Sequence, residues 1–255
     1  MKLIKQLLAV ALLAAALTGC SDDPAVEDPI NNPANGYLVS ETYQNGVLSS
    51  KLEYDDDNRL LKLLMFNNEG SLTGTTICSY NDNGQLVSQA VHSIDQDVVI
   101  HEFEYNNNGR IKKSMMRIDA EAIATLSYEY IGNQVIANGW AISGVQFVQT
   151  YTIEEGNVVL EEMVYPELPQ ANYVKERSDF DGKKFIGGFF YGMINLATES
   201  NPGREKLTTA AVIGSFDWDW QYTYNKDGYV TTATSYDHVS GEKIDFFEYK
   251  LIPAK

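Results

Sequence analysis

Hydrophobic and polar residues alternate with a period of two along most of the chain after residue 36. In residues 122–130, for example, Ala, Leu and Tyr at even positions oppose Ile, Thr, Ser and Glu at odd positions. Successive side chains of a β-strand point to opposite faces, so this alternation predicts strands with one apolar and one polar face. Charged residues recur on the polar face, where a charge near a bilayer midplane costs roughly 2–4 kcal/mol. The pattern therefore predicts a soluble all-β protein.

A short motif separates these strands: an aromatic residue, a polar cluster, Gly or Asn, and then an aliphatic residue. Clear copies are YDDDNRLL from Tyr54, YNDNGQLV from Tyr80, YNNNGRI from Tyr105 and YNKDGYV from Tyr224. Asn and Asp bond to nearby backbone amides and Gly accepts positive φ, so each copy predicts a hairpin turn. The spacing predicts an antiparallel up-and-down meander of about 15 strands. This number favours either a closed wide barrel or a strongly curved sheet.

The repeat is interrupted near residues 183–214, which are rich in glycine and contain Asn-Pro-Gly at 201–203. We expect this non-repeat insertion to be either a plug or lid over an opening, or a long strand followed by a surface loop. Within it, residues 204–213 are expected to form a short helix. Residues 37–255 are otherwise predicted to form a single antiparallel β-domain.

The first 19 residues indicate a lipoprotein signal peptide. Two lysines precede an apolar run at residues 7–17, which is too short to span a bilayer because that takes about 20 apolar residues. The run ends in Leu-Thr-Gly-Cys, which resembles a bacterial lipobox with Cys20 as the lipidated residue. Cys20 is therefore expected to anchor the protein in a membrane through its lipid. The alternative is an ordinary cleavage site with an incidental cysteine.

Residues 20–36 contain prolines and acids but no aromatic residue, and they are predicted to be a flexible acidic linker. Its Ser-Asp-Asp at 21–23 resembles the surface-export signal of Bacteroidetes lipoproteins. The whole chain carries 19 Lys and Arg against 35 Asp and Glu, a formal net charge of −16. This charge argues against nucleic acid as a partner and is compatible with a neutral ligand such as a glycan.

Candidate metal ligands are few, and no metal or cofactor is predicted. Cys78 is the one cysteine after Cys20, so no internal disulfide is expected, and its strand pattern predicts a small buried residue. The histidines lack zinc-site spacing, and His101, on the face of Phe103, is expected to be part-buried with a partner. Residues 55–58, Asp-Asp-Asp-Asn, carry oxygens that suit calcium, but their position in the repeat favours a turn.

The most aromatic strand is predicted at residues 216–224, FDWDWQYTY. Five rings share one of its faces: Phe216, Trp218, Trp220, Tyr222 and Tyr224. A core role is favoured, because five exposed rings in a row would promote aggregation. The other hypothesis is that Trp218, Trp220 and Tyr222, together with Trp140, line a groove or barrel mouth and bind a glycan or peptide. Both hold if only the ends of the row reach the opening.

No Gly-x-Ser-x-Gly elbow or phosphate loop occurs, so no catalytic residue is predicted and the protein is not expected to be an enzyme. A carbohydrate-active hydrolase, one alternative, needs two carboxylates across a cleft. Asp217 and Asp219 are roughly 7 Å apart on one strand, but they oppose the aromatic face. A carboxylate pair inside the barrel beside Trp218 would favour a hydrolase. A continuous aliphatic cavity would favour a lipid carrier instead.

The lipobox and the tandem Tyr-x-x-x-Gly hairpins resemble those of Bacteroidetes lipoproteins of unknown function with a porin-like β-fold. The hairpins more weakly resemble the tyrosine–aspartate repeats of Rhs-type shells, whose Asp-x-x-Gly-Arg pattern is approached at residues 106–110. The first resemblance implies an antiparallel barrel at the outer membrane, on the cell surface or the periplasmic side. It implies no activity. The sequence thus predicts a lipid-anchored binding or scaffold protein of the cell envelope.

Overall fold

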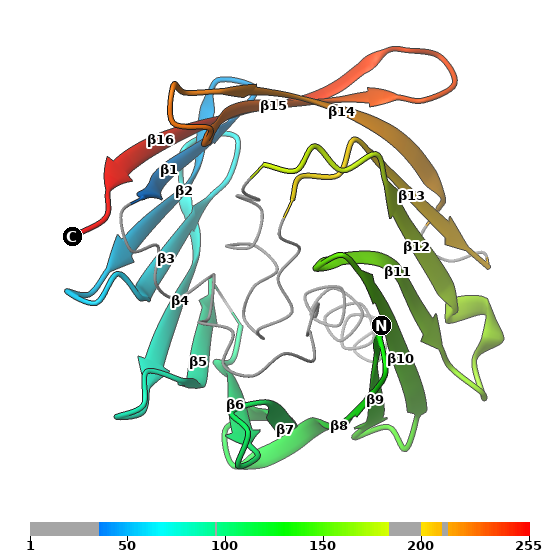
Figure 1. Cartoon of the computed structure of the whole chain (residues 1–255). Helices are drawn as coiled ribbons and strands as arrows, with labels where there is room; N and C mark the ends of the chain where they lie inside the picture. Colours follow the sequence, from blue (N-terminus) through cyan, green and yellow to red (C-terminus); the bar gives the residue numbers. More distant parts are fainter. Residues whose placement is uncertain (1–35, 95, 184–199, 211–213) are drawn as a thin grey trace.

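The computed structural model describes residues 36–94, 96–183, 200–210 and 214–255, whose strands form one closed antiparallel sheet of sixteen strands (Figure 1). Strand order follows chain order, and β16 pairs with β1 to close the barrel. The predicted all-β meander is confirmed. Of the two outcomes left open, the closed barrel is the one that forms.

The elements have these bounds: β1 Tyr37–Gln44, β2 Val47–Tyr54, β3 Leu60–Phe66, β4 Leu72–Tyr80, β5 Leu86–Ser93, β6 Val99–Tyr105, β7 Ile111–Ile118, β8 Glu121–Ile131, β9 Gln134–Ala141, β10 Gln146–Glu154, β11 Asn157–Val164, η1 Pro169–Ala171, β12 Tyr173–Ser178, β13 Arg204–Thr209, β14 Phe216–Tyr224, β15 Val230–Asp237 and β16 Lys243–Pro253. The turn η1 is a short 3₁₀-helix between β11 and β12. In the described part of the chain, no helix has the length and apolarity needed to cross a membrane.

Five hairpin turns share one hydrogen-bond pattern. In each, the side-chain Oδ1 of an Asp or Asn accepts the backbone N–H groups two and four residues later, at 2.8–3.0 Å. The residue three positions on has positive φ and is glycine in four turns and Asn58 in the first. Asp55 also accepts a bond from Nε of Arg59 at 2.7 Å, so residues 55–58 form a turn, as expected. The capping residues are Asp55, Asn67, Asn81, Asn106 and Asn225.

The tyrosine that opens the motif ties each hairpin to the strand before it. Four tyrosines at the ends of β2, β4, β6 and β8 donate their hydroxyl hydrogen to a backbone carbonyl 15–20 residues earlier, at 2.8–2.9 Å. Alternate strands of a meander run toward the same end, so these bonds lie at one end of the barrel, along β1–β8. They are made by Tyr54, Tyr80, Tyr105 and Tyr130.

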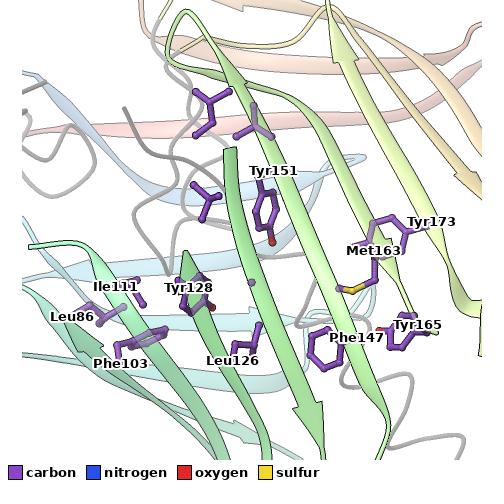
Figure 2. Packing of buried hydrophobic residues seen from close by; sticks show 14 of the residues in the cluster. Leu86, Phe103, Ile111, Leu126, Tyr128, Phe147, Tyr151, Met163, Tyr165 and Tyr173 are labelled. Carbon is purple, nitrogen blue, oxygen red and sulfur yellow. The ribbon is translucent and has the colours of Figure 1, made fainter. Parts of the chain in front are cut away.

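Buried side chains come from one face of the sheet, which is the interior because a single-layer barrel covers only its inner face. Figure 2 shows Leu126 on β8 and Phe147 and Tyr151 on β10 within one apolar cluster. The outer face carries ion pairs, such as Nζ of Lys250 with Glu41 at 2.6 Å. A charged outer face of this kind suits water and would be costly in lipid.

Cys78 is buried in the apolar cluster, as predicted. His101 also takes its expected face, with its ring centroid 4.2 Å from that of Phe103. It is buried more completely than the part-buried position expected, at 6% exposure, and its Nε2 has no hydrogen-bond partner in the described part of the chain. Burial lowers the pKa of His101 to about 3, so the imidazole is neutral.

The helix expected within residues 204–213 is wrong for its first six residues, which form β13. Glu205 and Leu207 lie on the same, inward face, and the strand pairs with both β12 and β14. Hydrogen bonding to two neighbouring strands outweighs any local helix preference. The expected plug or lid falls mostly on residues 184–199, which lie outside the described residues.

Candidate functional site

The buried charged side chains of the described residues lie together on β11, β12 and β13. Lys175 and Arg177 are in phase with buried Tyr173 along β12, so they face the interior. The sequence pattern assigns Glu and Lys to the outer face, so this cluster was not predicted. The one feature of the sequence that could have predicted it is that Lys175 and Arg177 share the alternate positions of Tyr173. The charged cluster consists of Glu161, Lys175, Arg177 and Glu205.

One side of the cluster is built around Glu161, which has no exposed surface. Its Oε1 accepts hydrogen bonds from the Tyr173 hydroxyl at 2.7 Å and from Nε2 of Gln149 at 3.0 Å. Its Oε2 lies 3.5 Å from Nη2 of Arg177. The carboxylate is therefore held by neutral donors on one oxygen and faces a guanidinium with the other.

The other side is built around Glu205. Nε of Arg177 donates to its Oε2 at 3.0 Å, and Nζ of Lys175 lies 2.9 Å from the same oxygen. Burial raises the pKa of Glu205, but Lys175 and Arg177 lower it by more, so it lies below its ordinary value. Glu205 is consequently ionised. The charged cluster contains two acidic and two basic side chains.

An aromatic row on β14 borders the charged cluster. Trp218 pairs directly with Glu205 across β13 and β14, so the row faces the interior. All five rings are half-buried. Successive ring centroids are 4.0, 6.2, 6.3 and 6.4 Å apart from Phe216 to Tyr224. We call the inward faces of β11–β14, with cluster and row together, the charged wall.

The two halves of the aromatic row have different surroundings. Tyr222 and Tyr224 pack on the second apolar cluster, which contains Val39, Leu52, Leu63 and Val230. The Tyr222 hydroxyl donates to the carbonyl of Pro202 at 3.0 Å, and that of Tyr224 donates to Asp181. Among the described residues, neither apolar cluster includes Phe216, Trp218 or Trp220. The tyrosine half is core, whereas the tryptophan half (Phe216, Trp218 and Trp220) is not part of it.

The structure therefore brings together three of the four predicted ligand-binding residues: Trp218, Trp220 and Tyr222. It does not bring Trp140 to them. Trp140 pairs with Thr125 and Gln146, which face outward, and it is 42% exposed on the outer surface.

Asp217 and Asp219 lie on the outer side of β14, opposite the aromatic row, as expected. Asp217 accepts two hydrogen bonds from Arg204, at 2.9 and 2.7 Å. Asp219 lies 3.0 Å from Nδ1 of His238. Within the described ranges, no three His, Cys, Asp or Glu side chains are grouped so as to hold a metal ion.

The barrel matches several solved structures, and two of them are from Bacteroides. A porin-like protein from Bacteroides vulgatus ATCC 8482 matches with a TM-score of 0.56 and 14% identity over 84% of this chain and 98% of that one. A porin-like protein from Bacteroides uniformis ATCC 8492 gives a TM-score of 0.37 and 12% identity over 86% of this chain and 90% of that chain. No protein-family model and no curated protein matches the sequence. The first likeness confirms the porin-like antiparallel fold that the hairpin repeats suggested.

Proposed function

We propose that this protein is a binding protein of the bacterial cell envelope that holds a glycan or peptide on the tryptophan half of its aromatic row. The observation that carries this proposal is the placement of Trp218 and Trp220. Both face the interior and are half-buried, yet neither belongs to an apolar cluster of the described residues. Large aromatic rings that retain accessible surface inside a barrel offer stacking surfaces, and flat stacking favours a sugar ring.

The location is inferred from the N-terminal segment and the fold. The signal peptide at residues 1–19 and the lipobox cysteine Cys20 support a lipid anchor, with residues 20–36 as its tether. The porin-like structures from Bacteroides support an envelope protein of the outer membrane. We infer that the barrel is carried on the cell surface or the periplasmic side of that membrane, with its charged outer face in water.

Tryptophan fluorescence tests the proposal directly. A chain that begins at residue 21 retains the whole barrel, because β1 begins at Tyr37 and pairs with β16. Trp140→Phe in that chain leaves Trp218 and Trp220 as the reporters. Red-shifted emission that acrylamide quenches is expected. Blue-shifted emission that resists quenching would mean that both rings are core, and the proposal would be dropped.

A carbohydrate-active hydrolase is the second candidate, and one observation favours it. Glu161 and Glu205 are a carboxylate pair inside the barrel, and Glu205 is beside Trp218. The lowered pKa of Glu205 suits a nucleophile, but a glycosidase also needs a protonated partner. Arg177 contacts both carboxylates and helps to lower the pKa of Glu205, so Glu205 is not that protonated partner. Release of reducing sugar from a polysaccharide, abolished by Glu205→Gln, would establish this second function in place of simple binding.

A further inference from the structure

The structure places an ionised carboxylate next to the tryptophan half of the aromatic row. Glu205 and Trp218 are directly opposite each other on β13 and β14 and share the inward face. Side chains that face each other across an antiparallel pair start about 4.5–5.5 Å apart at Cβ. A ligand that contacts the Trp218 ring is therefore within hydrogen-bonding reach of the Glu205 carboxylate.

The two oxygens of Glu205 have different roles. Oε2 receives both Lys175 and Arg177, at 2.9 and 3.0 Å, which fixes the carboxylate in one orientation. The side chain of Glu205 keeps 11% of its surface exposed. An ionised carboxylate that is held in place through one oxygen and keeps accessible surface is a strong acceptor for a ligand donor.

The charges around Glu205 decide which chemical group of a ligand can approach it. A ligand carboxylate would face Glu205 with no cation of its own, since Lys175 and Arg177 are already engaged. A ligand ammonium would approach those same two cations at close range. A hydroxyl group needs no counter-charge and can donate to Oε1 without disturbing the balance of the cluster.

We propose that Glu205 and Trp218 form a subsite for a neutral sugar ring, in which Trp218 contacts the ring and Oε1 of Glu205 accepts a hydroxyl hydrogen. This inference rests on the binding function proposed above and narrows it to neutral glycans. Acidic glycans are disfavoured by repulsion from Glu205. Glu205 is the specificity-determining residue, and Lys175 and Arg177 position it.

Calorimetric titration of the chain beginning at residue 21 tests the subsite. The probes are maltohexaose, cellohexaose and mannohexaose, with hexagalacturonate as the acidic sugar of equal length. We expect at least one neutral probe to bind the protein. Hexagalacturonate should bind the protein at least about ten-fold more weakly than that neutral probe. Glu205→Gln should weaken the neutral probe about ten-fold by removing a charge-assisted hydrogen bond.

Glu176→Gln is the matched control. It removes an equal charge from the neighbouring strand β12, but Glu176 lies on the outer face, 3.6 Å from Lys206. It should change affinity by less than about two-fold, with folding of both variants checked by circular dichroism. If Glu205→Gln does not fold, the neutral-against-acidic comparison on the unaltered chain decides alone.

The outcomes separate the subsite from the binding function. Equal affinity for acidic and neutral probes, or equal loss in E205Q and E176Q, would overturn the subsite. If Trp218→Ala still abolished binding in that case, the binding function would stand. If no hexasaccharide binds, or Trp218→Ala changes nothing, both proposals are wrong.

Discussion

The barrel has two walls made of the same alternating strands but filled in different ways. The repeat wall, formed by β2–β8, buries only neutral side chains, such as Ser114 hydrogen-bonded to Tyr128 at 3.1 Å. The charged wall, β11–β14, buries two acids and two bases beside the aromatic row. The turn motif thus constrains the ends of the strands, whereas the middle of each inward face is free to carry other chemistry.

Stability alone does not explain the charged wall. Removing charges from water costs several kcal/mol per ion, and apolar replacements of buried ion clusters are often neutral or stabilising. The repeat wall shows that this fold closes part of its interior without buried charge. The difference between the walls therefore favours a functional role for the charged cluster, and the following experiments test that difference in order of expected effect.

Arg177→Met should have the largest effect on stability. Arg177 is shared by Glu161 and Glu205, so its loss leaves two buried carboxylates with one cation between them. Breaking a buried pair by removing one partner costs about 3–5 kcal/mol in the free energy of unfolding. Urea denaturation followed by circular dichroism measures this cost.

Lys206→Met is the control on the same two strands. Lys206 lies 3.6 Å from Glu176 on the outer face of β12 and β13, where both side chains are about half exposed. An exposed pair of this kind contributes about 0–1 kcal/mol. Equal losses of unfolding free energy in the two variants would show that the buried cluster contributes no more to stability than an exposed ion pair.

The two walls should respond to acid in different pH ranges. In the repeat wall, burial lowers the pKa of His101 to about 3, against about 6.5 in the unfolded chain. Below pH 6.5 the unfolded state binds a proton that the folded state does not, so stability falls by up to about 1.4 kcal/mol per pH unit. The lowered pKa of Glu205 acts later, because its contribution is lost only below about pH 4.3.

His101→Gln should therefore flatten the loss of stability between pH 6.5 and 4.5 and leave the steeper loss below pH 4 in place. Urea unfolding at half-unit pH intervals gives the two slopes. His92→Gln, at an exposed histidine on β5, should keep the slope of the unaltered chain. An unchanged slope in His101→Gln would mean that His101 is protonated within the folded barrel.

Gly139→Ala should destabilise the strand pair β9–β10, where the two walls meet. A Cβ built at Gly139 would lie 2.2 Å from ring atoms of buried Phe147, so the ring must move. Overpacking of this kind costs about 1–3 kcal/mol. Adding Phe147→Leu should recover part of the loss, and additive costs in the double variant would contradict the proposed clash.

Local patterns predicted the strands and turns well because their causes are local. The capping carboxamides, the residues of positive φ and the two-residue alternation all act within a few positions, as at Asn81 and Gly84. Closure depends instead on β1 pairing with β16, which are about 200 residues apart, and no local signal specifies that register.

The candidate site was predicted only in part, because alternation gives two faces but not always which one is inside. In β9, small residues face inward and Trp140 faces outward, since Phe147 fills the space over Gly139. In β12, charged residues face inward because partners on β11 and β13 neutralise them. Both reversals depend on neighbouring strands that the local pattern does not reveal.

Tyr105→Phe should have the smallest effect, about 1 kcal/mol, because it removes one hydroxyl bond to the carbonyl of Leu86 at 2.8 Å. Tyr222→Phe removes the equivalent bond to the carbonyl of Pro202 at 3.0 Å. If the Tyr222 hydroxyl has only a structural role, the same small loss of stability is expected. Thermal unfolding of the two variants measures both losses.

If Tyr222 also contacts the ligand, Tyr222→Phe should weaken binding of a neutral hexasaccharide while Tyr105→Phe leaves it unchanged. Equal binding in both variants would confine the ligand to the tryptophan half of the row.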